Sequence, residues 1–185
     1  DAAKIAEIER HFAPPTYEDI AEPVAPYDAA RFTDPAFAAW TRTNLFPHKQ
    51  PGYSIVTVSF KPAGGVPGDA TAEQMEALAD LAEKYSLGEL RIAHEQNVVL
   101  PYVRKQDLHK LWQVLGEHGL ADANIGLITD IISCPGLDYC NLANARAIPI
   151  AQRLSRHFSD PALQSEIGPI TLNISGCINA CGHHH

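Results

Sequence analysis

All four cysteines of this 185-residue chain lie in its last third, and they form two close pairs. Cys134 and Cys140 stand in SCPGLDYC, and Cys177 and Cys181 stand in GCINACG. Thiolates bind soft metals, and four of them meet the requirement of a cubane iron–sulfur cluster. Zinc is the first alternative, but its cysteine pairs usually have about two to four residues between them, whereas the first pair here has five. The spacing favours [4Fe–4S], with zinc, disulfides and inert buried thiols as alternatives.

The segments around the cysteines predict where the backbone would carry these ligands. Apolar residues from Gly126 to Ser133 predict a strand that leads into Cys134, and the alternating run Pro169–Ser175 predicts another that leads towards Cys177. Glycines beside both pairs would let the backbone approach an inorganic centre closely: Gly136, Gly176 and Gly182.

The residues after Cys140, NLANARAIPIAQRLSRHF, predict a helix that is bent or restarted at Pro149. A helix that begins beside Cys140 would direct free N–H groups and the positive end of its dipole towards a negatively charged cluster.

Composition excludes several classes of function. The formal net charge is −8 and no stripe of lysine and arginine is present, so we expect no nucleic-acid binding. No apolar run reaches the length of a membrane-spanning helix, and no signal peptide is visible at the N-terminus. We therefore expect a cytoplasmic protein without a membrane partner.

The first 52 residues are predicted to be a linker with short helices. Ile5, Ile8 and Phe12 have helical spacing and predict a helix over Asp1–Phe12. Seven prolines follow between Pro14 and Pro51, with a further short helix expected near Pro35–Asn44.

Residues 53–122 predict a strand, a helix, a hairpin and a second helix. Thr71 and Gln74 have the spacing of a capping box, and an apolar stripe that starts at Met75 follows them. The expected segments are the strand Tyr53–Phe60, the helix from Thr71 to Gly88, the hairpin of Glu89–His94 with Asn97–Val103, and the helix Gln106–Gly119. This order is most of a ferredoxin-like sandwich.

SCPGLDYCNLANAR followed by GCINACGHHH resembles the cluster- and siroheme-binding signature of the nitrite/sulfite reductase family. The resemblance implies an α+β chain: a ferredoxin-like (βαββα) half-domain over residues 53–122, followed by part of an α/β 4Fe–4S/siroheme domain over residues 123–185. It also implies that this is a segment of a longer enzyme, with the second ferredoxin-like half and the cluster-binding cysteines.

The same resemblance implies cofactors, partners and roles. Cys134, Cys140, Cys177 and Cys181 would hold a [4Fe–4S] cluster, with Cys181 also bridging to the iron of siroheme. Asn179 would hydrogen-bond to siroheme or to cluster sulfur, or else satisfy the local turn. The implied reaction is the six-electron reduction of nitrite to ammonia or of sulfite to sulfide, with ferredoxin or a flavoprotein as electron donor. The alternative is an iron–sulfur or zinc module for electron transfer or binding, without siroheme.

Anionic substrates require cationic groups near the reacting atom. Arg91, Arg146 and Lys61 are the candidates in this chain, each with a solvated or ion-paired side chain as the alternative. The run His183–His185 is interpreted as native sequence with an open role, and a truncated expression tag or a metal-binding tail are the alternatives. His94 and His109 have no partner at ligand spacing and are interpreted as ordinary surface or core residues.

Overall fold

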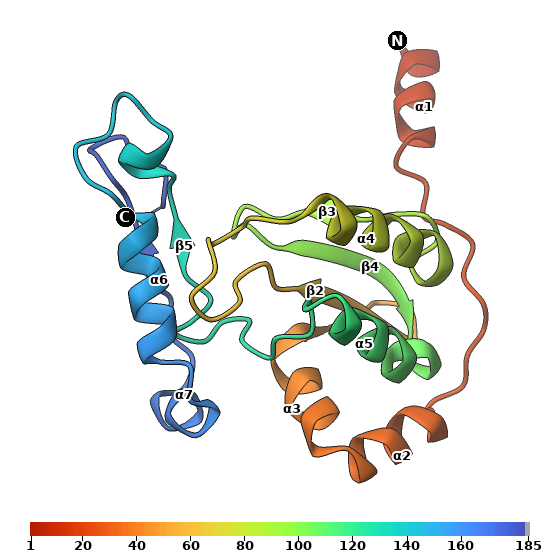
Figure 1. The fold of residues 1–185 in the computed structure, drawn as a ribbon. Helices are drawn as coiled ribbons and strands as arrows, with labels where there is room; N and C mark the ends of the chain where they lie inside the picture. The colour runs from red at the N-terminus through yellow and green to blue at the C-terminus, as the bar shows by residue number, and fades with distance from the viewer. Residues whose placement is uncertain (184–185) are drawn as a thin grey trace.

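The structure is a computed structural model that describes residues 1–183. At its centre is a four-stranded antiparallel sheet with the order β1-β2-β4-β3 (Figure 1). Its strands are β1 (Leu45–Pro47), β2 (Tyr53–Val58), β3 (Arg91–Ile92) and β4 (Val98–Arg104). The hairpin expected on either side of Glu95-Gln96 is confirmed, since β3 and β4 pair antiparallel across that turn.

Two helices of the half-domain pack against this sheet: α4 (Ala72–Tyr85) and α5 (Leu108–Glu117), the latter preceded by the 3₁₀ turn η1 (Lys105–Asp107). The capping box of Thr71 and Gln74 is present at the start of α4. Leu78 begins the buried stripe, whereas Met75 is 45% exposed, so the apolar contact starts one turn later than the sequence pattern predicts.

Side-chain alternation gives the sheet two different faces. Val56, Val58 and Leu100 belong to the hydrophobic core that α4 and α5 cover. Thr57 and Val99 line a cavity instead, together with loops of the C-terminal segment. The ferredoxin-like half thus has one face for its own core and one that meets the rest of the chain.

The N-terminal segment contains α1 (Ala2–Arg10), α2 (Ala25–Thr33) and α3 (Pro35–Asn44). Figure 1 shows α1 extending away from the rest of the molecule, and it has no buried residue. By contrast, Phe37 and Trp40 of α3 lie in the main core, and β1 pairs with β2. The part of the expected linker from Pro35 to Pro47 is therefore packed as an integral layer of the half-domain.

The C-terminal segment has little regular structure around its cysteines. It contains β5 (Ile132–Ser133), the 3₁₀ turn η2 (Gly136–Asp138), α6 (Ile148–His157), α7 (Pro161–Ile167) and β6 (Asn173–Ile174). The strands expected before Cys134 and Cys177 exist, but each has only two residues, and they pair in parallel with each other.

The helix expected over residues 141–158 is confirmed only in its second part, because α6 begins at Ile148, next to Pro149. The part expected directly after Cys140 is wrong. The backbone of the intervening residues makes long-range hydrogen bonds that a helical ladder would exclude. Asn144 and Ala145 both donate from their N–H groups to the carbonyl of Gly176, at 2.8 and 3.0 Å. No helix N-terminus therefore points at the cysteines from this loop.

No helix among residues 1–183 has both the length and the apolar character needed to cross a bilayer.

Phe37 and Phe32 provide a matched test of the packed N-terminal layer, because they are 0% and 91% exposed. We expect Phe37→Ala to lower the free energy of unfolding by about 3–5 kcal/mol, since it leaves a cavity in the core. Phe32→Ala should change it by less than about 0.5 kcal/mol. Urea denaturation followed by tryptophan fluorescence measures both, and equal effects of the two substitutions would contradict this assignment.

Candidate functional site

Cys134 is held at the point where β5 ends. Its backbone N–H donates to the carbonyl of Ile174 at 3.0 Å, and its Sγ accepts a hydrogen bond from the N–H of Gly176 at 3.0 Å. The side chain is only 7% exposed. The sulfur of Cys134 is thus fixed in place by the backbone of the segment that carries Cys177.

Glycines let the two cysteine loops approach each other. A Cβ on Gly176 would lie 2.7 Å from the carbonyl oxygen of Ala145, and a Cβ on Gly136 would lie 2.7 Å from the nitrogen of Ala147. Gly136 also has φ = +57°, a conformation that side chains disfavour. These glycines therefore fix one cysteine loop against the other.

The remaining cysteines are more accessible than Cys134. Cys140 and Cys177 are half-buried, Cys181 is exposed, and all four cysteines are free thiols. Within residues 1–183, no three Cys, His, Asp or Glu side chains are grouped so that they could hold a metal ion. The structure thus brings the two cysteine loops together but does not gather three of the thiols at one metal position.

Exposed side chains surround the cysteines on the same loops. Asn179 is exposed, and no hydrogen bond joins its side chain to another residue among those that the structure describes. Tyr139, Leu142 and Ile178 are 81%, 72% and 92% exposed. Large apolar side chains that are exposed on these loops favour a contact surface over a core.

Of the three cationic candidates, the two arginines are exposed and paired locally. Arg91 lies 2.6 Å from Glu89 and also donates to the hydroxyl of Tyr102, and Arg146 lies 2.5 Å from Asp138. The bond with Glu89 raises the pKa of Arg91, and the bond with Asp138 raises that of Arg146. Both guanidinium groups thus stay charged.

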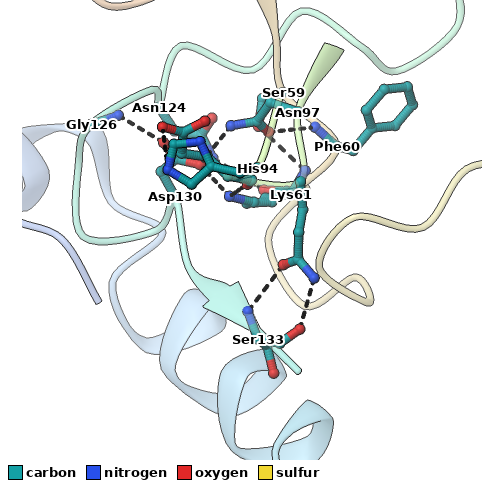
Figure 2. A network of polar contacts seen from close by, with 11 residues as sticks. Ser59, Phe60, Lys61, His94, Asn97, Asn124, Gly126, Asp130 and Ser133 are labelled. Carbon is teal, nitrogen blue, oxygen red and sulfur yellow. Dashed lines mark hydrogen bonds and ion pairs between the residues drawn. The ribbon is translucent and has the colours of Figure 1, made fainter. Parts of the chain in front are cut away.

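Lys61 is different, because it is buried in a polar network between the ferredoxin-like half-domain and the C-terminal segment (Figure 2). Its ammonium lies 2.6 Å from the carboxylate of Asp130 and donates to the carbonyl of Glu95 at 2.5 Å; its side chain is 2% exposed. Burial lowers the pKa of Lys61, and the charge of Asp130 opposes that shift. With its charge already paired, Lys61 is not available to a substrate anion.

Asp130 has further partners that the sequence did not indicate. Asn97 donates to its Oδ1 at 3.1 Å, and the N–H of Gly126 donates to its Oδ2 at 2.9 Å. The only sequence signal was an acidic residue within an apolar run. Asp130, in the loop that leads to Cys134, is therefore bonded to Lys61, which follows β2, and to Asn97, which precedes β4.

A cavity of about 480 Å³ lies beside this network. Thr57 and Val99 line it from the sheet, and Asn173 lines it from β6, with a buried Oδ1 that has no hydrogen-bond partner among residues 1–183. The rings of His94 and His183 meet edge to face at its rim, with centroids 5.7 Å apart. His109 lies elsewhere, 3.3 Å from Asp34. His184 and His185 lie outside the described residues.

Comparison with known proteins gives the same fold and a consistent group of relatives. Residues 47–118 match the model described as "Nitrite/Sulfite reductase ferredoxin-like half domain". Over 97% of this chain, the fold resembles 30% of the Mycobacterium tuberculosis NirA protein, with a TM-score of 0.60 and 23% sequence identity. That likeness shows the fold.

Curated relatives cover most of this chain. A chloroplastic ferredoxin–nitrite reductase of Zea mays is 33% identical over 77% of this chain and 25% of its own length. The ferredoxin–nitrite reductase of Synechococcus elongatus is 32% identical over 80% and 28%. A sulfite reductase [NADPH] hemoprotein beta-component of Xanthomonas campestris is 31% identical over 65% and 22%. The chain thus spans about a quarter of the length of these relatives.

Asp130→Asn tests the buried ion pair. Because the substitution leaves the ammonium of Lys61 buried without a counter-charge, we expect the free energy of unfolding at pH 7 to fall by about 3–5 kcal/mol. Burial lowers the pKa of Lys61 below its ordinary value of 10.5, which the unfolded chain would have. Since the unfolded state then binds more protons, the variant should regain stability as the pH rises from 7 towards 10.5.

Glu89→Gln is the control, because it removes the acidic partner of the exposed Arg91. Its effect should stay below about 1 kcal/mol. Denaturant titrations at several pH values measure both variants, and an Asp130→Asn protein as stable as Glu89→Gln at pH 7 would disprove the structural role of the pair.

Proposed function

The chain belongs to the nitrite/sulfite reductase family, and we propose that its C-terminal segment holds a [4Fe–4S] cluster on Cys134, Cys140, Cys177 and Cys181. The observation that carries this proposal is the joining of the two cysteine loops. Cys134 bonds to Ile174 and Gly176, and the loop after Cys140 bonds to Gly176 as well. Half-buried or exposed side chains at the other three positions leave their thiols free to turn towards a shared centre.

We propose further that siroheme binds at the same loops, with Cys181 as a ligand shared between the cluster and the haem iron. Cys181 is the most accessible of the four thiols, which suits a residue that serves two groups. Tyr139, Leu142 and Ile178 would contact the face of the macrocycle, and Asn179 would donate a hydrogen bond to it. Siroheme and the cluster would together supply a substrate-binding iron and a one-electron store.

The proposed reaction is the six-electron reduction of nitrite to ammonia or of sulfite to sulfide. It is supported by the names of the relatives, which are ferredoxin–nitrite reductases and a sulfite reductase hemoprotein. The same names support a ferredoxin or a flavoprotein as electron donor. Since this chain spans about a quarter of those relatives, the activity is proposed for the whole enzyme of which these residues form a part.

Arg91 and Arg146 are proposed as cationic groups for the substrate side of the site, with Arg146 the stronger of the two. It follows Cys140 on the same loop and is 63% exposed beyond its pair with Asp138. Absence of nucleic-acid and membrane partners and a cytoplasmic location stay predictions from composition.

Metal and cofactor analysis of protein prepared without oxygen tests the proposal. We expect about four irons and four sulfides per chain, and a siroheme spectrum after siroheme is added. Cys181→Ser should lower the iron content and uncouple the siroheme spectrum from the cluster, because it removes the shared thiolate. Ser165→Ala, a substitution in α7 away from the cysteine loops, serves as the control and should leave both unchanged.

Two outcomes would contradict parts of this proposal. One zinc per chain without sulfide would make the cysteines a structural zinc site. Four irons without any siroheme binding would favour an iron–sulfur electron-transfer module instead.

A further inference from the structure

Gln96 lies in the turn between β3 and β4 and holds both backbone polar groups of the residue before Cys134. Its Nε2 donates to the carbonyl of Ser133 at 2.8 Å, and its Oε1 accepts from the N–H of Ser133 at 3.0 Å. Figure 2 labels Ser133 and marks two dashed lines at it. Ser133 itself is buried. The side-chain amide of Gln96 thus makes the two hydrogen bonds that the backbone of a neighbouring strand would make with Ser133.

The bonds of β5 show why this contact matters to Cys134. In a parallel pair, alternate residues direct their N–H groups to the same neighbour. Ile132 and Cys134 donate to the carbonyls of Leu172 and Ile174, both at 3.0 Å, so the N–H of Ser133 faces the opposite side. Gln96 occupies that side, and the segment ending at Cys134 is consequently held from both edges.

The turn that carries Gln96 is fixed in its own right. Gln96 has φ = +61°, which costs energy for any residue other than glycine. Next to it, the carbonyl of Glu95 accepts from Lys61 and the amide of Asn97 donates to Asp130. The backbone conformation is therefore imposed by neighbours, and it directs the side chain of Gln96 towards Ser133.

We propose that Gln96 is a positioning residue through which the ferredoxin-like half fixes the backbone and the thiol of Cys134. The positioning of the Cys134 thiol by Gln96 does not depend on a cofactor. The further consequence, that Gln96 sets the environment of one cluster ligand, rests on the proposed function.

Alkylation of the metal-free chain tests the first part. Iodoacetamide labelling, followed site by site with mass spectrometry, compares the buried Cys134 with the exposed Cys181. Because Gln96→Met removes two hydrogen bonds at nearly constant side-chain size, we expect Cys134 to be labelled about tenfold faster. The labelling rate of Cys181 should not change.

Two further variants separate positioning from strain and from general destabilisation. Gln96→Gly relieves the positive φ but also removes the amide, so it should speed the labelling of Cys134 as Gln96→Met does. Gln164→Met removes a buried amide that bonds to Thr129 at 2.8 Å and makes no bond to Ser133, so it should leave the labelling of Cys134 unchanged. Unchanged labelling in Gln96→Met, or equal acceleration in Gln164→Met, would overturn the proposal.

The second part is tested on the chain reconstituted with iron and sulfide under anaerobic conditions. We expect Gln96→Met to retain the cluster but to shift its midpoint potential and its electron paramagnetic resonance spectrum, whereas Gln164→Met shifts neither. An unshifted potential and spectrum in Gln96→Met would overturn the link to the cluster. If the parent chain takes up no cluster, the proposed function fails, and the labelling rates alone decide the role of Gln96.

Discussion

The ammonium of Lys61 and the carboxylate of Asp130 lie 2.6 Å apart in a site that is nearly closed to water. Burying two charges is costly, and the cost is offset only where geometry is good and the remaining polar atoms are bonded. Here Glu95, Asn97 and Gly126 complete the bonding of both groups. The arrangement of the chain depends on this pair, because Lys61 follows β2 while Asp130 belongs to the segment that leads to the cysteines.

The two faces of the sheet have different surroundings. One face, with Val56 and Leu100, is closed by α4, α5 and α3 into a hydrophobic core. The other carries Thr57 and Val99 towards a cavity that the C-terminal loops also line. The half-domain therefore supports loops that have little regular structure themselves, and functional residues often lie on such loops.

The cysteine loops depend on backbone contacts between segments far apart in sequence. Gly176 bonds to the Sγ of Cys134 and accepts from Asn144 and Ala145, and its lack of a side chain permits this approach. The backbone groups of these loops bond to the other loop instead of forming regular secondary structure within their own. For this reason the residues directly after Cys140 form turns although their sequence has a helical pattern.

Local signals in the sequence determined much of this protein: the capping box at Thr71, the apolar stripes of α4 and α5, the hairpin around Gln96, and the grouping of all four cysteines. Each depends on residues within a few positions of one another, and local patterns report such interactions well. Only the tertiary structure decided the pairing of Lys61 with Asp130, the hold of Gln96 on Ser133 and the burial of Phe37 in the sheet's core. These contacts join residues tens of positions apart, and their energies come from burial and long-range hydrogen bonds, which no local pattern records.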